Sequence, residues 1–195
     1  DTTKSIVTGL VGLIIGVIMS QLAIEKLTGH TIEKRAELLK KAAQVPCVWA
    51  GNYSVGVNLL NALTQQAAKV LSTGYDAEVI EMHHRYKVDA PSGAALMFGQ
   101  EAAMGRGIDF DENAILSREG ITGVRPRGAI GFSSIRGGDV IGDHTVMFAG
   151  LGERVEITHK ASSRMTFAKG AVRASSWLAS HEKGLFDMQD VLDLH

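Results

Sequence analysis

One segment constrains the fold more than any other, because a short strand at 77–82 runs through a polar loop into a helix at 94–104. Val79 and Ile80 give the strand its apolar, β-branched character, and a Ser-Thr-Gly turn comes before it. Ser92 can cap the free N–H groups of the first helical turn. The sequence therefore predicts a strand-loop-helix unit whose loop lies at the edge of a sheet.

The loop of this unit concentrates groups that bind anions and donate protons. His83 and His84 follow the strand, and Lys87 comes shortly before the helix. A helix N-terminus has unpaired N–H donors and a partial positive charge, so a carboxylate bound there would meet the N–H groups of Gly93 and Ala94. An acidic small molecule is the expected ligand.

The residues of the loop allow two other interpretations, a metal site and a loop without a function. Adjacent histidines on a strand face opposite ways, and neither Cys47 nor His144 is near them in sequence, so we predict no metal site. Alternatively, His83 and His84 are loop residues that are exposed or have hydrogen-bond partners for their ring nitrogens, and Lys87 is a solvated charge.

Residues 78–95 resemble the signature of the 4-hydroxy-tetrahydrodipicolinate reductase (dihydrodipicolinate reductase) family, E-[IV]-x-E-x-H-x-x-x-K-x-D-x-P-S-G-T-A. Every fixed position matches except the threonine, which is Ala94 here. The similarity extends over about 28–194, and its further matches lie at 51–58, 117–120, 128–132, 136–140, 152–154 and 159–167.

The resemblance implies roles for individual residues. His83 and Lys87 correspond to the family's proton donors. The substrate contacts it implies are His84, Ser92, Gly93, Ala94 and Thr28. The family reduces a cyclic dicarboxylate with NADH or NADPH in the diaminopimelate route to lysine, and a group that titrates near neutrality is an efficient proton supplier for such a step.

The resemblance also implies a dinucleotide-binding domain, of which the sequence holds only part. A glycine-rich G-x-G-x-x-G turn is expected early in a family member, and the glycines before residue 28 have the wrong spacing. The cofactor contacts that remain by resemblance are Ala50, Gly51, Asn52, Tyr53, Arg164 and Phe167. We therefore expect weak binding of NADPH or NADH and impaired catalysis.

Residues 1–26 resemble no part of the family. Their apolar run at 6–19 is shorter than the about 20 residues of a membrane span. A packed helix is favoured over a membrane anchor at 6–23 or a signal segment. The expected domains are this segment, a cofactor-domain remnant at 27–53, a substrate and oligomerisation domain at 54–163, and a C-terminal helical segment at 164–195.

Composition supports a cytoplasmic enzyme that does not bind nucleic acid. The net charge is -1 with 45% hydrophobic residues, so there is no basic excess to attract a polyanion. The lone cysteine, Cys47, lies in an apolar strand predicted at 45–50 and is expected to be reduced and buried.

The C-terminal half is predicted to form a hairpin, with strands at 144–149 and 154–159, followed by a helix at 168–180. His144 and His159 are expected in the sheet or at a subunit interface, because the family's mixed sheet builds a homotetramer. Core candidates in the helix are Val172, Trp177 and Leu178.

The fold class expected is α/β: a mixed β-sheet substrate and oligomerisation domain with flanking helices, plus a remnant of a Rossmann-type domain. The function expected is NAD(P)H-dependent 4-hydroxy-tetrahydrodipicolinate reductase. The alternative is a non-catalytic dicarboxylate-binding or oligomerisation fragment.

Overall fold

The structure is a computed structural model that describes residue 37 and residues 40–195. The described chain divides into two compact units, one formed by residues up to Asn58 together with Met165–His195, and one by Leu59–Arg164. Residues 1–26, Thr28 and part of the cofactor-domain remnant expected at 27–53 lie outside the described residues.

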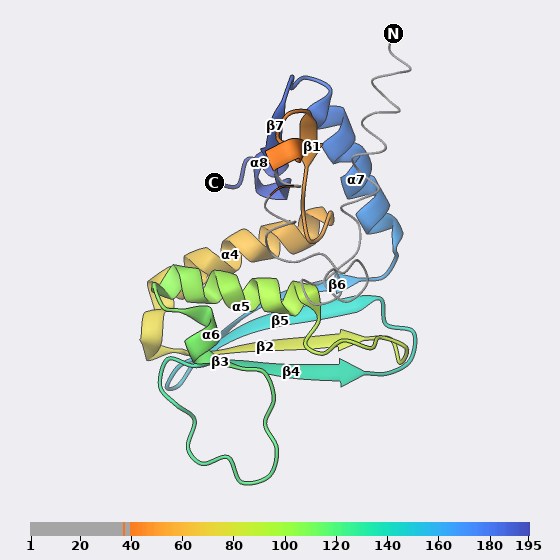
Figure 1. Ribbon diagram of the computed structural model, residues 1–195. Helices are drawn as coiled ribbons and strands as arrows, with labels where there is room; N and C mark the ends of the chain where they lie inside the picture. The colour runs from red at the N-terminus through yellow and green to blue at the C-terminus, as the bar shows by residue number, and fades with distance from the viewer. Residues whose placement is uncertain (1–36, 38–39) are drawn as a thin grey trace. The chain divides into compact units, whose positions relative to one another are not determined.

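A five-stranded mixed sheet forms the larger unit (Figure 1), in the order β3-β4-β2-β5-β6. β2 pairs in parallel with β4 and antiparallel with β5, β3 is parallel to β4, and β5 and β6 form an antiparallel hairpin. This is the mixed α/β fold that the sequence predicted. The strands are β2 (Asp76–His83), β3 (Ala114–Ile115), β4 (Ile130–Arg136), β5 (Gly142–Ala149) and β6 (Arg154–Ala161).

Helices cover one face of this sheet. α5 (Gly93–Arg106) packs on β2 and β4, and the later turns of α4 (Val55–Leu71) lie beside it. The two helices approach closely at Gly105, where a Cβ would meet the carbonyl oxygen of Gln65. Short elements, η1 (Ser72–Gly74) and α6 (Phe110–Asn113), connect the helices to the strands. The core between α5 and the sheet is formed by the buried side chains of Phe98 on α5 and of Val79, Ile130, Val146 and Phe148 on the strands.

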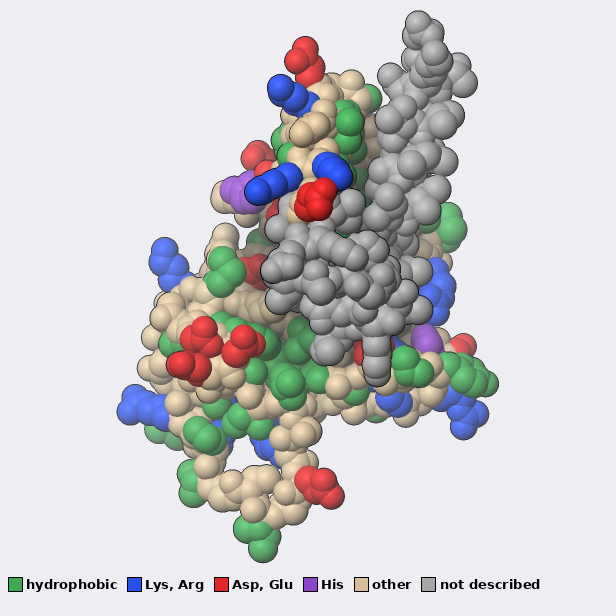
Figure 2. All heavy atoms as spheres, in the orientation of Figure 1, with side chains coloured by type: hydrophobic (Ala, Val, Ile, Leu, Met, Phe, Trp, Pro, Cys, Tyr) green, Lys and Arg blue, Asp and Glu red, His purple; other side chains and the backbone are tan. Residues whose placement is uncertain are grey.

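Among the described residues of this unit, no helix lies over the opposite face of the sheet. Residues 80 and 82 of β2 and 135 of β4 alternate with the buried positions and therefore point to this face. The loop at 116–128 projects from the same unit, and Figure 2 shows hydrophobic side chains along it. Ile121 and Val124 on this loop are almost fully exposed.

The smaller unit combines a two-stranded parallel sheet with two helices. β1 (Pro46–Val48) pairs with β7 (Gly184–Phe186), and α7 (Met165–Leu178) and α8 (Met188–Leu192) complete its core. The core residues are Val48, Tyr53, Ala174, Leu178, Met188 and Val191, with Trp177 packed against them.

Two expectations about this unit need correction, and one is confirmed. Val172 was predicted in the core of the C-terminal helix but is exposed, because α7 turns Ala174 and Leu178 inward instead. The strand predicted at 45–50 is limited to Pro46–Val48. Cys47 is a free, buried thiol as expected, and burial raises its pKa.

Among the residues that the structure describes, no helix combines the length and the apolar character needed to span a bilayer.

Candidate active site

The end of β2 brings a histidine and a glutamate together on the helix-covered face of the sheet. Residues alternate between buried and partly exposed along β2, so Glu81 and His83 point the same way. Both are buried, with Glu81 1% and His83 8% exposed. The Nδ1 atom of His83 lies 2.5 Å from Oε2 of Glu81, a short hydrogen bond between the two side chains.

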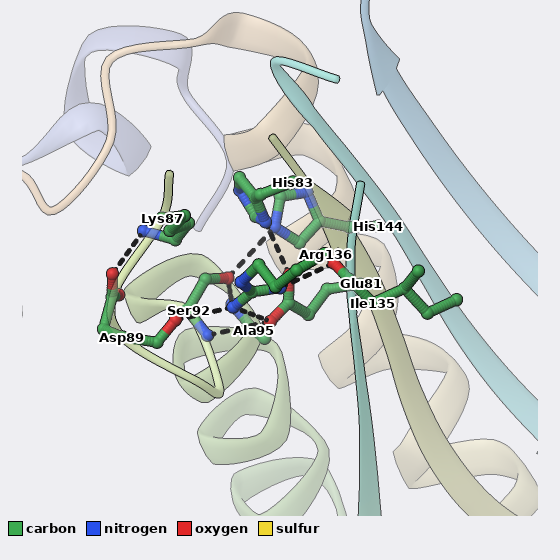
Figure 3. Close-up of polar contacts among 9 residues, drawn as sticks. All are labelled: Glu81, His83, Lys87, Asp89, Ser92, Ala95, Ile135, Arg136 and His144. Carbon is green, nitrogen blue, oxygen red and sulfur yellow. Dashed lines mark hydrogen bonds and ion pairs between the residues drawn. The ribbon is translucent and has the colours of Figure 1, made fainter. Parts of the chain in front are cut away.

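Glu81 is held by further donors from two other elements (Figure 3). The guanidinium of Arg136, at the end of β4, donates from Nη1 to Oε2 at 2.9 Å and from Nη2 to Oε1 at 2.8 Å. The backbone N–H of Ser92 donates to Oε1 at 3.2 Å. Burial alone would raise the pKa of Glu81, but hydrogen bonds from His83, Arg136 and Ser134 outweigh it and lower the pKa to about 2. The carboxylate is therefore ionised.

A second buried histidine completes the interior of the site. His144 on β5 is the cross-strand partner of Glu81, and its ring lies edge-on to that of His83 with centroids 5.1 Å apart. Its Nε2 lies 3.3 Å from the hydroxyl of Ser92. Burial, followed by the proximity of His83, lowers the pKa of His144 to about 3. His144 is thus a neutral sheet residue, and its burial under α5 argues against the predicted interface alternative.

Lys87 lies in the loop after β2, where its ammonium pairs with a carboxylate. Its Nζ is 2.8 Å from Oδ1 of Asp89, and the Lys87 side chain is 22% exposed. Burial raises the pKa of Asp89, but the hydrogen bond and charge of Lys87, the backbone N–H of Asp89 and the charge of Arg136 together outweigh burial and lower the pKa. Arg136 also reaches this loop, because its Nη2 donates to the backbone carbonyl of Asp89 at 2.6 Å. The same guanidinium therefore contacts Glu81 and the loop that carries Lys87.

The helix start has the geometry that the sequence predicted. Ser92 is the N-cap of α5, and its hydroxyl accepts a hydrogen bond from the N–H of Ala95 at 3.2 Å. The hydrogen bonds of the described residues leave the N–H groups of Gly93 and Ala94 for a ligand. His84 follows the last residue of β2, and its buried Nδ1 has no partner among the described residues.

The predicted cofactor contacts in the smaller unit form a loop tied down from within. Tyr53 is buried, and its hydroxyl donates to the carbonyl of Val48 at 2.9 Å. The Asn52 side chain accepts from the N–H of Ser54 at 2.8 Å. Helix α7 approaches this loop so closely that a Cβ at Gly170 would collide with the carbonyl of Tyr53. The loop backbone, rather than the Tyr53 side chain, is left to contact a ligand.

Of the remaining predicted site residues, Ala50 is half-buried and Gly51 exposed in this loop, and Phe167 is half-buried in the first turn of α7. Arg164 is exposed just before α7.

In the described part of the chain, one group of side chains could offer ligand atoms to a metal: Asp187, Asp190 and His195. These are exposed or half-exposed, and the aspartates already form the capping box of α8. That group has an evident structural role without an ion.

Sequence reasoning singled out neither Glu81, Arg136 nor His144 for the site. One signal was present: Glu81 shares the buried face of its strand with Val79 and His83, and a carboxylate at such a position requires compensating donors. Neither Arg136 as a donor to Glu81 nor His144 as a neighbour of His83 was predictable, because they come from β4 and β5, far along the chain.

The buried His144 predicts how stability depends on pH. Its folded-state pKa is depressed to about 3, so below its ordinary value the unfolded chain binds a proton that the folded chain excludes. Stability should therefore fall as pH drops from about 6.5 toward 3, by up to about 1.4 kcal/mol per pH unit from this group. Urea unfolding at about pH 7.5 and about pH 5 measures the slope. His144→Gln, which keeps a hydrogen-bonding partner for Ser92 but cannot titrate, should reduce it, and an unchanged slope would contradict this account.

Comparisons with known proteins show which family the chain is similar to. Residues 56–192 match the family model described as dihydrodipicolinate reductase, C-terminus. The chain is 57% identical over 168 residues to a 4-hydroxy-tetrahydrodipicolinate reductase of Pseudomonas fluorescens, covering 86% of this chain and 63% of that protein. The corresponding protein of Chromobacterium violaceum is 58% identical over 167 residues, covering 86% and 62%.

A solved structure is also similar. Dihydrodipicolinate reductase from Paenisporosarcina sp. TG-14, described as dipicolinate bound, superposes with a TM-score of 0.58 at 25% identity, covering 83% of this chain and 61% of that one. The chain thus spans less than two thirds of the length of the relatives it matches. The family model nevertheless covers most of the chain, including the whole β2–α5 site, and the chain belongs to the dihydrodipicolinate reductase family.

Proposed function

We propose that this chain provides the substrate-binding and proton-donating part of a 4-hydroxy-tetrahydrodipicolinate reductase in the diaminopimelate route to lysine. The observation that carries the proposal is the arrangement in Figure 3, where His83 and Lys87 lie next to the capped start of α5. Family membership supports this assignment.

The ligand class follows from the charges and donors around the helix start. Lys87 offers an ammonium, and Gly93 and Ala94 offer N–H groups at the positive end of the helix dipole. His84 adds a ring whose Nδ1 has no partner among the residues that the structure describes. A planar dicarboxylate would use these donors, at the cost of competing with Asp89 for Lys87. A similar protein has been solved with dipicolinate, which is such a ligand.

His83 and Lys87 are the proposed proton donors. His83 is buried beside the carboxylate of Glu81, whose hydrogen bond to Nδ1 holds the ring in place. Lys87 is partly exposed and can exchange its proton with water. Proton transfer from positioned groups of this kind contributes about 10²–10⁴-fold to rate.

The described residues fit a nucleotide cofactor only in part. The 50–53 loop and the residues Arg164 and Phe167 are proposed contacts, with Gly51 offering exposed backbone. The described part of the chain has no G-x-G-x-x-G turn to hold phosphates. NADH or NADPH would supply the hydride when bound. Thr28 is a proposed contact of the substrate, not of the cofactor.

We also propose that the uncovered face of the sheet is a contact between copies of this chain in a homotetramer. Ile80, Met82 and Ile135 lie on this face, and Ile135 is 44% exposed. A cytoplasmic location is proposed as well, which the free thiol of Cys47 suits.

Lys87→Ala tests the ligand assignment. The variant should bind pyridine-2,6-dicarboxylate about 10- to 100-fold more weakly, because a charge-assisted hydrogen bond of about 1.5–3 kcal/mol is lost. Isothermal titration calorimetry measures the affinity. Lys69→Ala, which removes an exposed lysine at the end of α4, is the control for net charge. Equal affinities for the two variants would place the site elsewhere.

Turnover of freshly generated substrate with NADH or NADPH separates an enzyme from a dicarboxylate-binding fragment.

Ala94→Thr tests the one departure from the family signature. Restoring the hydroxyl should tighten dicarboxylate binding by about 0.5–1.5 kcal/mol, because a donor is added at the helix start. Ala94→Val has the same shape without the hydroxyl and should not tighten binding. If threonine and valine act alike in calorimetry, the hydroxyl has no role here.

Ile135→Lys tests the proposed subunit contact. A charge on the uncovered sheet face should shift the protein toward smaller species in sedimentation velocity, because desolvating an unpaired ammonium in an interface is unfavourable. Val172→Lys, at an exposed apolar position on α7, should leave the distribution unchanged. Association that is insensitive to Ile135→Lys would rule out this face.

A further inference from the structure

The pair formed by Glu81 and Arg136 lies next to the proposed proton donors and is largely buried. The Glu81 side chain is fully buried and that of Arg136 is 19% exposed. Their two hydrogen bonds are bidentate, the arrangement in which a guanidinium and a carboxylate fix each other's orientation. A buried ion pair is weak evidence for stability by itself, so its other contacts decide what it does.

The first of these contacts determines which nitrogen of His83 carries the exchangeable proton. An ionised carboxylate can only accept hydrogen bonds, so Nδ1 of His83 must donate to Glu81. The neutral ring is then the Nδ1–H tautomer, and Nε2 is the atom that gains and loses a proton. Space next to Nε2 is preserved by Gly142, where a Cβ would lie only 3.1 Å away.

The second contact reaches Lys87. Nη2 of Arg136 donates to the backbone carbonyl of Asp89 at 2.6 Å, and the carboxylate of Asp89 pairs with Lys87 at 2.8 Å. The segment just after β4 also holds the start of this loop, because the N–H of Gly137 donates to the carbonyl of His83 at 3.0 Å and the N–H of Arg85 donates to the carbonyl of Gly138 at 3.1 Å. Arg136 is thus connected to both proposed donors, through Glu81 to one and through Asp89 to the other.

We propose that Glu81 and Arg136 are positioning residues for proton donation: Glu81 keeps Nε2 of His83 as the proton-transferring atom, and Arg136 holds Glu81 and the Lys87 loop in one arrangement. This inference rests on the proposed function. A purely structural ion pair would stabilise the fold but would leave the tautomer of His83 and the turnover number unaffected.

Nitrogen-15 NMR of the histidine rings tests the first step on the unmodified chain. With His83 assigned through a His83→Gln spectrum, its ring should be the Nδ1–H tautomer when neutral. Glu81→Gln places an amide, which can donate, against Nδ1 and should convert the ring wholly or partly to the Nε2–H form. Glu78→Gln is the matched control, because Glu78 is also on β2 and also pairs with arginines, Arg118 and Arg125, but faces away from His83.

Binding and turnover test the second step. Glu81→Gln and Arg136→Lys should each lower kcat at least about tenfold, the usual scale for loss of a group that orients a functional histidine. Dipicolinate affinity should stay within about threefold for Glu81→Gln, because Glu81 does not face the ligand. Arg136→Lys retains the charge but cannot make the bidentate pair and the Asp89 contact together. This variant therefore tests the positioning role even if Glu81→Gln does not fold.

The outcomes separate this inference from the proposed function. An Nε2–H ring in the wild-type protein, or unchanged tautomer and kcat in folded Glu81→Gln, would overturn the positioning role while leaving dicarboxylate binding intact. A wild-type protein that binds no dipicolinate and turns over no substrate would instead overturn the proposed function, and with it the roles of His83 and Lys87 as donors.

Discussion

The buried carboxylate of Glu81 is the interaction on which the site depends. A carboxylate inside a protein is tolerated only when its oxygens accept hydrogen bonds. Here the donors come from His83 on β2, from Arg136 on β4 and from the N-terminus of α5. The compensation therefore fastens two strands and a helix at one point. Removing one partner of a buried pair typically costs about 3–5 kcal/mol, so the charge binds these elements together as well as serving the site.

The surroundings of this carboxylate explain why two histidines lie so close without sharing a role. His83 contacts Glu81 directly and can carry a charge that the carboxylate compensates. His144 lies beyond it, bonded to Ser92 under α5, and burial keeps it neutral. A second imidazolium there would face His83 at close range in a medium of low dielectric constant. His83 is thus the proposed proton donor, whereas His144 packs under α5 and hydrogen-bonds to the Ser92 cap.

Local patterns predicted the elements with local causes. The strand at 77–82, the Ser92 cap and the hairpin formed by β5 and β6 each depend on a few neighbouring residues, and each was found. Val172 was misplaced because spacing along a helix gives the width of an apolar stripe but not which edge of it meets a neighbour. His144 was predicted in the sheet, but its place beside His83 depends on the pairing of β5 with β2.

The sequence by itself determined the chemistry that is present: two histidines, a lysine and a capped helix start within one short segment, in an order that is recognisable as a family signature. Adjacent residues are tied by the chain, so their proximity needs no fold. Only the tertiary structure decided which groups act on them, because Arg136 and His144 reach Glu81 and His83 through strand pairing across more than fifty residues. Register between strands is set by the burial of whole faces, and no local pattern encodes it.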